Sequence, residues 1–528
     1  MKRTADFTLS LNTNNKPTRD PRHRKFRVLS TSLTIIVIVG IILLNVILGV
    51  VADRYPITID MSSDKVFTLS DESKAVAESI DKNVEVVIFA DVEDYFISLA
   101  EQLYTYYYTY YGEEVNLSNE FERLSREIHT SLAQLQTASD GKVTYSFIIP
   151  DQEPEKYAEY TKYNLGENNV LFISGERHRK TELATMCDMS STSSVTSKVE
   201  KVLVSNIYAL QGDDDRIIQV LTGHEEDANT IHGLQQLYEL NGYLFEELLI
   251  TGSAELNEKA ETLLIAAPAK DYSVQEIQRI RTWLKNDNMR NRHLMVYINP
   301  TADCPNLYEM LKTDFHIEVT DQLIYETDPN RYHHDGEKYN FGIVSADVAD
   351  TDYTDNSSGE LAVIMPRVRR LTCDLPSSAD GLAELGIPLT THPDTAWVSR
   401  VGSDGEKLEL TEKDYPLTST IAYVFESFDD NTQQAATTTV TVCGSAEIAY
   451  NQYIQNSTLK NEDLLLDIIR SITGYEINIS ISSKVIDKEA TTFTSDTQMV
   501  LGIWVFTIGV PAIVLIICLI VFLRRRSL

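Results

Sequence analysis

The stretch RIIQVLTGHEE, residues 216–226, joins a short apolar run to a polar turn that begins with glycine. An amphipathic run from Thr230 to Leu240 follows, and it ends at Asn241-Gly242, which is a helix stop signal. A second strand is predicted from Tyr243 to Ile250 and a third from Thr262 to Ala267, and the near-continuous apolar composition of the third suits a parallel strand that is covered on both faces. The stretch therefore predicts a βαβ unit and an α/β fold.

The turn at 223–226 follows the carboxyl end of a predicted strand, where open α/β sheets usually bind ligands. Gly223 would let the chain turn closely, while His224, Glu225 and Glu226 would face a cleft. The alternative is a solvated turn, because acidic residues favour the start of a helix without any catalytic role. We therefore treat these four residues as a hypothetical binding cleft and assign none of them to catalysis.

The charge of the chain is unevenly distributed. The 528 residues carry a formal net charge of −32. Residues 1–27 and the last five residues are basic, which leaves 35 Lys and Arg against 76 Asp and Glu between 52 and 498, a net charge of −41. Such a surface repels phosphate, so we expect no nucleic-acid partner.

Two long segments contain no Asp, Glu, Lys or Arg: residues 28–51 and residues 499–523. As helices that rise about 1.5 Å per residue, both can cross a hydrocarbon core of about 30 Å. Basic residues precede the first segment and follow the second, so the basic flank of each lies toward a chain terminus. Because basic flanks favour the cytoplasmic side, both termini are expected to be cytoplasmic. A cleaved signal peptide is the alternative for the first segment, but its apolar core is too long for that role. We predict a two-pass protein of the cell membrane.

The predicted organisation has seven parts. They are a disordered cytoplasmic tail (1–27), a transmembrane helix (28–51), a first extracytoplasmic α/β domain (55–212), a second one (213–485) with an insertion at about 328–435, a tether (486–498), a second transmembrane helix (499–523) and a basic cytoplasmic end (524–528).

Four cysteines lie outside the predicted spans: Cys187, Cys304, Cys373 and Cys443. They have neither a CxxC pair nor metal-ligand spacing, and the adjacent pair His333-His334 is not a metal site by itself. Two disulfides or four thiols are possible, and domains of this size favour thiols because they can fold without crosslinks. We expect no metal and no cofactor.

Several other segments allow a prediction. The run from Tyr95 to Tyr111 holds seven tyrosines, six of them crowded between 104 and 111. It is either an aromatic surface for a sugar or partner, or a helix packed on the next one, Asn119 to Gln136. The Ser/Thr-rich run Ser190 to Ser197 is predicted as a loop and Val195 to Ile207 as helical. A final strand is predicted from Tyr475 to Ser483.

A second candidate for the cleft is the turn that follows the predicted strand Thr438 to Cys443. It contains Gly444, Ser445 and Glu447, which we add to the hypothetical binding residues. An acyl-transfer enzyme would need a Ser or Cys at such a turn with a histidine base nearby. The pair Ser445 and His224 is the one combination in this sequence that would merit a test.

The order of several short motifs resembles the auxiliary proteins of gliding-motility-type ABC transport systems. The matching stretches are KVFTLS (65–70), FAD (89–91), LTGHEE (221–226), AAP (266–268), GSAE (444–447) with Asn451, and NEDL (461–464), followed by the apolar span with terminal arginines. Members usually have Gly-His-Gly-Glu where this chain has Gly223-His224-Glu225-Glu226. The resemblance implies a second external domain like the class I glutamine-amidotransferase (flavodoxin-like) fold, working beside a permease and a separate ATPase.

The leading hypothesis is therefore a non-catalytic auxiliary subunit of an ABC transport system, whose external domains bind substrate, envelope or partner subunits. The chain contains no Gly-x₄-Gly-Lys-[Ser/Thr] phosphate loop, so it is not the ATPase by that route. The alternatives are an envelope hydrolase or amidotransferase-like enzyme, and a membrane-anchored sensor.

Overall fold

The computed structural model describes residues 65–487, together with Ser32 and Arg524. Within that range it leaves out 167, 192–193, 214, 286–289, 329–330, 332–342, 349–362, 375–382, 392–394, 403–405, 416, 430–433, 457–458 and 476–480. The predicted tail, both predicted spans and the pair at 333–334 lie outside the described residues, apart from Ser32 and Arg524. No helix among the described residues is long and apolar enough to cross a membrane.

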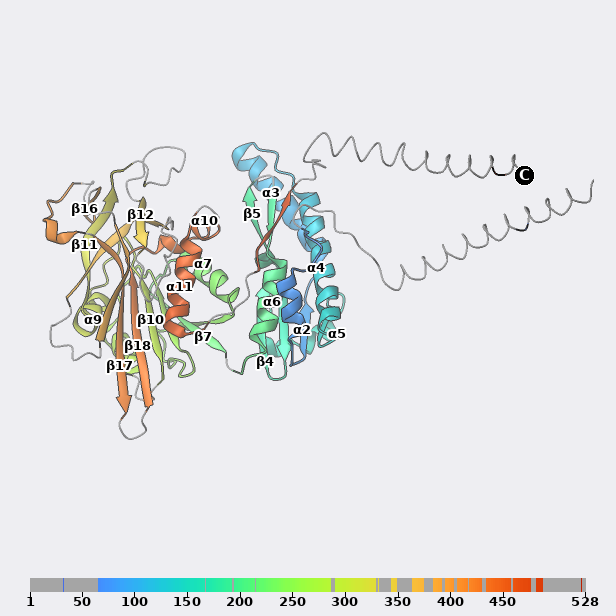
Figure 1. The fold of residues 1–528 in the computed structure, drawn as a ribbon, viewed down its shortest axis with the longest axis horizontal. Coiled ribbons are helices and arrows are strands. Elements are labelled where there is room, and N and C mark those ends of the chain that lie inside the picture. Colours follow the sequence, from blue (N-terminus) through green and yellow to red (C-terminus); the bar gives the residue numbers. More distant parts are fainter. Residues whose placement is uncertain are drawn as a thin grey trace, which may run out of the picture. The chain divides into compact units, whose positions relative to one another are not determined.

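The first part of the chain is built on a four-stranded sheet in the order β2-β1-β3-β4 (Figure 1). Its strands are β1 (Val84–Ile88), β2 (Val143–Phe147), β3 (Asn169–Ser174) and β4 (Arg177–Glu182). One face packs against the helices α2 (Asp71–Glu78), α3 (Val92–Tyr111), α4 (Ser118–Ala138) and α6 (Val199–Ala209). The other face is covered by tyrosines from α5 (Pro154–Ala158) and the short helix η1 (Thr161–Tyr163).

A second, three-stranded sheet in the order β19-β6-β5 corrects three expectations. The predicted loop Ser190–Ser197 belongs to the strands β5 (Cys187–Ser191) and β6 (Ser194–Ser197), so the helix begins at Val199 rather than at Val195. The last strand among the described residues, β19, is Lys484–Asp487, and it pairs antiparallel with β6. Of the predicted strand Tyr475–Ser483, Tyr475 and residues 481–483 are not in a strand, and residues 476–480 lie outside the described residues. Local composition could not reveal this pairing, because the partner strand lies almost 300 residues further along the chain.

The second part of the chain is built on five parallel strands, as the predicted βαβ unit requires. They are β7 (Arg216–Thr222), β8 (Tyr243–Leu249), β9 (Thr262–Ala266), β10 (Arg292–Tyr297) and β18 (Gln434–Cys443). Their spatial order is β8-β7-β9-β10-β18, which corresponds to the order 2-1-3-4-5 of doubly wound sheets. The order reverses between β7 and β9, so a topological switch point lies at their carboxyl ends.

Helices cover both faces of this parallel sheet. The helices α7 (Ala228–Glu239) and α11 (Asn461–Thr473) pack on one face, and α8 (Val274–Leu284) and α9 (Pro305–Phe315) pack on the other. Ser273 caps α8, as its position in the sequence predicts, and Glu276 completes a capping box. The α/β class is therefore confirmed for the described residues.

The region predicted as an insertion extends the edge of the sheet beyond β18. The long strand β17 (Thr418–Asp429) pairs antiparallel with β18, and β15 (Ala383–Thr390), β12 (Ile343–Val348) and β13 (Val363–Pro366) follow outward. Three further strands form a side branch: β11 (Ile317–Glu326), β14 (Val368–Cys373) and β16 (Ala396–Arg400).

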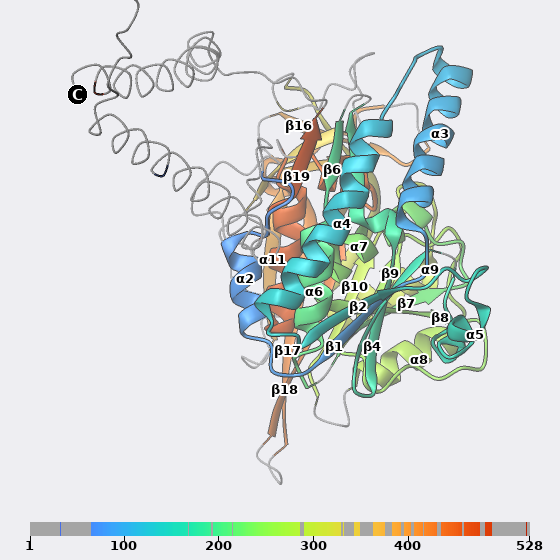
Figure 2. The ribbon, with the colours of Figure 1, turned by 90° about the vertical axis from the view of Figure 1, so that its right-hand side faces the viewer.

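The long helix α3 only partly follows the prediction that it packs on the next helix. Its first half does so: Val92, Phe96 and Ala100 are buried, and the ring of Phe96 stacks on Phe121 of α4 with centroids 5.7 Å apart. Its second half carries tyrosines that stay exposed. Figure 2 shows the whole length of α3 in the ribbon. The four cysteines outside the predicted spans are free thiols.

Candidate functional site

The switch point is formed by the loops that follow β7 and β9, and the two loops are hydrogen-bonded to each other. The backbone amides of Ala269 and Lys270 both donate to the carbonyl of His224, and the amide of Asp227 donates to the carbonyl of Ala266. Asp227 also caps α7, because its side chain accepts from the amide of Thr230. The carboxyl ends of β7 and β9 are thus held as one rigid edge.

Two residues of the β7 loop have left-handed backbone conformations. Gly223 has φ +120°, and a Cβ placed on it would lie 2.8 Å from the methyl carbon of Thr251. Glu225 has φ +56° although it is not glycine. An ion pair between Glu225 and Lys270 lies across the two loops.

The carboxylate of Glu226 folds back onto its own loop. It accepts hydrogen bonds from the amides of Gly223 and His224, both at 3.0 Å. These bonds satisfy backbone donors that the turn leaves unpaired, so they stabilise the loop. Glu226 is therefore committed to loop structure rather than presented to a ligand.

His224 lies in a closed environment made by the two loops and by the first turn of α8. It is 6% exposed, and its ring packs on Tyr272 with centroids 4.0 Å apart. Its Nε2 atom lies 3.3 Å from a carboxylate oxygen of Glu276. The same oxygen accepts from the amide of Ser273, so the helix cap fixes the carboxylate beside the imidazole. Burial, followed by the charge of Glu226, raises the pKa of Tyr272 well above its ordinary value.

Chemically, an imidazole beside a fixed carboxylate is an arrangement that can hold or move a proton. Here, however, both side chains are covered: those of His224 and Glu276 are 8% and 12% exposed. Sequence reasoning missed Tyr272 and Glu276. The sequence feature that could have identified them is their position shortly after β9, the strand that flanks the switch point.

The other predicted residues form a separate group at the end of β18. Ser445 is fully buried and its hydroxyl donates to the carbonyl of Pro366, while Glu447 pairs with Arg367. Gly444 is packed against backbone, because a Cβ on it would lie 2.2 Å from the carbonyl oxygen of Arg369. Two strands, β9 and β10, separate β18 from β7. The Ser445 hydroxyl is paired with Pro366 and His224 packs on Tyr272 beside Glu276, so the structure does not bring Ser445 to His224.

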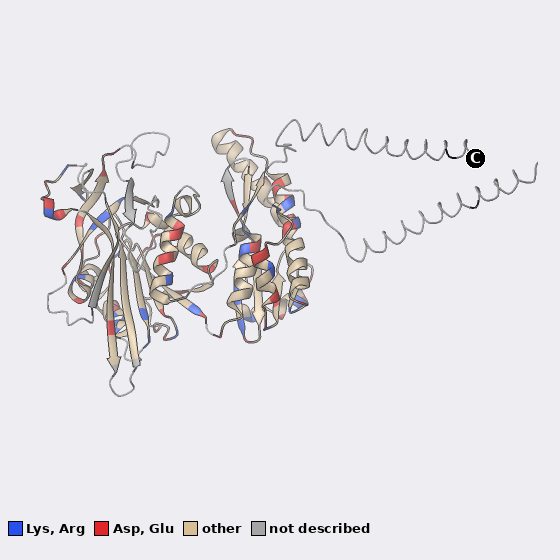
Figure 3. Ribbon diagram, viewed as in Figure 1, with Lys and Arg blue, Asp and Glu red and all other residues tan. Residues whose placement is uncertain are grey.

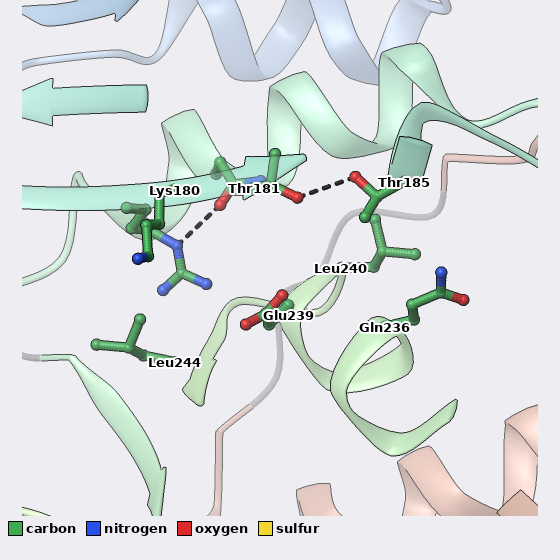
Figure 4. Close-up of a pocket in the computed structure, with 9 residues that line it drawn as sticks. Lys180, Thr181, Thr185, Gln236, Glu239, Leu240 and Leu244 are labelled. Carbon is green, nitrogen blue, oxygen red and sulfur yellow. Dashed lines mark hydrogen bonds between the residues drawn. The ribbon is translucent and has the colours of Figure 1, made fainter. Parts of the chain in front are cut away.

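A different hollow, which the sequence gave no reason to expect, lies between β4 and the end of α7 (Figure 4). Its cavity volume is about 20 Å³, which is room for about one water molecule, and it opens to solvent. Its lining residues are Arg179, Lys180, Thr181, Thr185, Asn206, Gln236, Glu239, Leu240 and Leu244.

Arg179 links the first part of the chain to the second beside this hollow. Its guanidinium donates to Asn206 of α6 and to the carbonyls of Gly242 and Tyr243 at the start of β8. Burial raises the pKa of the nearby Glu239 carboxyl. The buried carbonyl oxygen of the Gln236 side chain has no hydrogen-bond partner among the described residues. The hollow therefore lies at a polar contact between the two parts of the chain, and the Gln236 side-chain oxygen is an acceptor without a partner among the described residues.

The fold and these sites define a mixed α/β protein whose second part is a doubly wound sheet with a closed, charged switch point. A family model described as a domain of unknown function (DUF7088) matches residues 63–187, which include β1 to β4 and the helices between them. No curated protein sequence matches the chain.

Two solved structures show limited similarity. The "mmIFT52 N-terminal domain" is 14% identical over 50% of this chain and 99% of its own length, with a TM-score of 0.34. The exo-beta-1,4-mannosidase Op5Man5 from Opitutaceae bacterium strain TAV5 is 8% identical over 68% of this chain and 50% of its own length, with a TM-score of 0.25. Neither similarity is close enough to support an argument about function.

Proposed function

We propose that the protein is a non-catalytic auxiliary subunit of an ABC transport system. In this proposal two transmembrane helices, at 28–51 and 499–523, anchor the chain with both termini in the cytoplasm, and the α/β domains lie outside the cytoplasm. The domains bind substrate, envelope or partner subunits, and the permease and the ATPase are separate chains. The charge-free segments, their basic flanks and the order of the short motifs support this topology and this class.

The likeness of the second domain to class I glutamine-amidotransferase folds belongs to the same proposal. The strand order 2-1-3-4-5 supports it, since that order is the flavodoxin-like one. The loop at 223–226 supports it as well, because Glu225 adopts the left-handed conformation expected where relatives carry glycine.

One observation carries the non-catalytic part of the proposal: the candidate nucleophile Ser445 and the candidate base His224 are buried against different partners and do not contact each other. An acyl-transfer enzyme needs a nucleophile within hydrogen-bond reach of its base. Here the Ser445 hydroxyl donates to Pro366 and is fully buried, and His224 packs between Tyr272 and Glu276. This geometry favours a scaffold with a binding surface.

The test is purification of the tagged full-length protein from its native membrane in mild detergent, followed by mass spectrometry. We expect a multi-span permease and an ATPase to be recovered with it, in amounts that persist after a salt wash. If the protein is recovered alone, also after crosslinking, the auxiliary-subunit proposal fails. A Ser445→Ala variant measured for hydrolysis of ester and amide substrates tests the catalytic alternative separately, and we expect no change.

A further inference from the structure

The outer half of α3 presents an array of exposed aromatic rings, which we call the tyrosine surface. It consists of Tyr104, Tyr106, Tyr108, Tyr110 and Tyr111, whose exposed fractions are 40%, 48%, 57%, 73% and 63%. Beyond Tyr107 every side chain of the helix is exposed, so the last turn has no tertiary packing in the described part of the chain. Large contiguous aromatic surfaces of this kind usually mark an interaction site.

The array is preorganised. The rings of Tyr104 and Tyr108 stack with centroids 6.0 Å apart, and those of Tyr106 and Tyr110 are 5.1 Å apart. Gly112 ends the helix in the left-handed conformation, and its amide donates to the carbonyl of Tyr108 while the amide of Glu113 donates to Tyr107. The helix end is therefore well defined, and it holds the rings in a fixed arrangement.

The tyrosine surface is also free of charge. Residues 103–111 contain no Asp, Glu, Lys or Arg, although the chain as a whole carries −32. Figure 3 shows this end of α3 in tan, without red or blue. The surface therefore suits a partner that contacts aromatic rings and hydroxyl groups and that does not depend on a charged side chain for pairing.

The position of the surface relates it to the predicted anchors. The strand β19 ends at Asp487, opposite Ser194 at the turn of the β5–β6 hairpin. Figures 1 and 2 both show this end of the small sheet on the same side as the outer end of α3. Only residues 488–498 separate Asp487 from the apolar segment at 499–523, and 11 residues span at most about 40 Å. The outer end of α3 is thus on the side of the small sheet at which the described chain ends before the second apolar segment.

We propose that the tyrosine surface lies in the headgroup region of the membrane that anchors the chain. This inference rests on the anchored topology of the proposed function. Tyrosine is enriched at this depth because its ring contacts the acyl boundary while its hydroxyl stays with the polar headgroups. The surface is the end of a convex helix rather than a hollow, which fits a lipid interface better than a bound sugar. α3 then acts as a support that fixes the height of the first domain above the bilayer.

The acidic residues beside the surface refine the lipid preference. Glu113 and Glu114 follow the last tyrosine directly and are exposed. They would be repelled by anionic headgroups at low ionic strength. A zwitterionic surface is therefore the favoured one, and added salt should reduce the penalty for an anionic surface.

The test uses the full-length protein reconstituted in phosphatidylcholine vesicles, with a nitroxide spin label on Tyr110→Cys or Tyr104→Cys. The matched control is Ile97→Cys, which lies on the same helix, is 44% exposed and precedes the tyrosines. The unsubstituted chain, labelled in the same way, gives the background signal from spin label on the native cysteines. We expect the ratio of oxygen accessibility to nickel-chelate accessibility to be several-fold higher at 110 than at 97. Vesicles with added phosphatidylglycerol should lower the ratio at 110 until salt is added.

Three other outcomes would be informative. If the protein stays in the vesicles after alkaline carbonate but the label at 110 is as water-exposed as the one at 97, the inference is overturned and the anchored topology stands. If the label at 110 is shielded from both reagents, a protein surface covers the tyrosines and the inference is likewise overturned. If carbonate extracts the protein, the anchored topology itself fails. Replacing Tyr106, Tyr110 and Tyr111 by serine should move a label at 104 toward water.

Discussion

At the scale of single residues, the buried polar groups of the parallel sheet fall into two kinds. His224 has a carboxylate and an aromatic ring beside it, whereas His293 on β10 has neither. Both ring nitrogens of His293 are without a hydrogen-bond partner among the described residues, and the side chain is 1% exposed. A buried imidazole without partners can be accommodated only in its neutral form.

This difference predicts a pH dependence. Burial lowers the pKa of His293 from 6.5 to about 3. The unfolded chain binds this proton below pH 6.5 and the folded chain does not, so the free energy of unfolding falls by up to about 1.4 kcal/mol per pH unit between pH 6.5 and 3. Below pH 3 both states are protonated and this contribution levels off.

The variant His293→Leu should lose this part of the slope. We expect stability close to that of the parent at pH 8 and a smaller loss at pH 5, measured by urea unfolding of both proteins at each pH. His316→Leu is the control, since His316 follows α9 and is only partly buried. Equal slopes for His293→Leu and the parent would show that His293 is solvated.

Gly444 permits a second prediction at this scale. A Cβ at this position would lie 2.2 Å from the carbonyl oxygen of Arg369 and 3.0 Å from that of Ser419. Both atoms are backbone, so neither can move without disturbing a sheet. We expect Gly444→Ala to lower the free energy of unfolding by about 3 kcal/mol or more. The control is Gly166→Ala, where a Cβ would make only ordinary contacts with Asn169. A loss at Gly444 no larger than at Gly166 would contradict the packing described here.

At the scale of elements, sequence analysis worked where the determinant is local. Ser273 marks the start of α8 and Asn241-Gly242 marks the end of α7 within one or two residues, because caps and stop signals act through neighbouring backbone groups. It failed at Ser190–Ser197, where a Ser/Thr-rich run becomes a hairpin because β19 pairs with it from a distant part of the chain. It also could not place Ser445 relative to His224, because the order of strands in a sheet depends on pairing between segments that are distant in the sequence.

Gly233 in the middle of α7 illustrates how tertiary packing overrides local preference. Alanine would favour the helix by about 1 kcal/mol. However, a Cβ at Gly233 would lie 1.8 Å from the carbonyl oxygen of Ala449, in the short helix η4 (Glu447–Ala449). The clash exceeds the propensity gain, because it involves backbone on both sides.

We therefore expect Gly233→Ala to destabilise the protein by at least about 2 kcal/mol, in spite of the higher helix propensity. The matched control is His232→Ala, one position earlier on the exposed face of the same helix, which should be neutral or slightly stabilising. Thermal unfolding of the three proteins decides between the two effects. A stabilised Gly233→Ala variant would mean that α7 does not pack closely on η4.

At the scale of the whole molecule, the described chain is organised as an insertion. The first sheet, the helices around it and the β5–β6 hairpin come from residues before 212, and β19 returns to complete this part. The parallel sheet and its antiparallel extension lie between α6 and β19 in the sequence. Both ends of the main described range, at Lys65 and Asp487, therefore belong to the first part. In the anchored topology that we propose, any movement of the second part reaches the membrane through the first.

A buried ionic network holds the two ends of this first part together. Glu200 of α6 accepts from the amide and hydroxyl of Ser70, which caps α2, and pairs with Lys484 of β19 at 2.6 Å. Lys484 also donates to the carbonyl of Thr68. The side chains of Glu200 and Lys484 are 3% and 13% exposed, so solvent screens the pair only weakly.

This network predicts that Lys484→Met is costly although Lys484 lies at the end of the described chain. Burial would raise the pKa of Glu200, but hydrogen bonds from Lys484, Ser70 and Ser73 outweigh it and lower the pKa below 4.5. The network therefore stabilises the fold fully above about pH 4.5, and the contribution is lost as pH falls through the folded pKa. At pH 7 we expect Lys484→Met to cost about 3 kcal/mol, because it leaves a buried carboxylate unpaired.

A double-mutant cycle isolates the network from general packing. The double variant Glu200→Leu with Lys484→Met should be more stable than the sum of the single losses implies, since no unpaired charge remains. Lys460→Met is the control, because its ion pair with Asp463 is largely exposed and should contribute little. Hydrogen exchange locates the effect: in Lys484→Met the amides of β6 and β19 should exchange faster, while those of β7 and β9 keep their protection. Uniform loss of protection in the small sheet and in the parallel sheet would instead mean that the two parts of the chain unfold as one unit. In that case the pairing of β19 with β6 would not be a separate weak point of the fold.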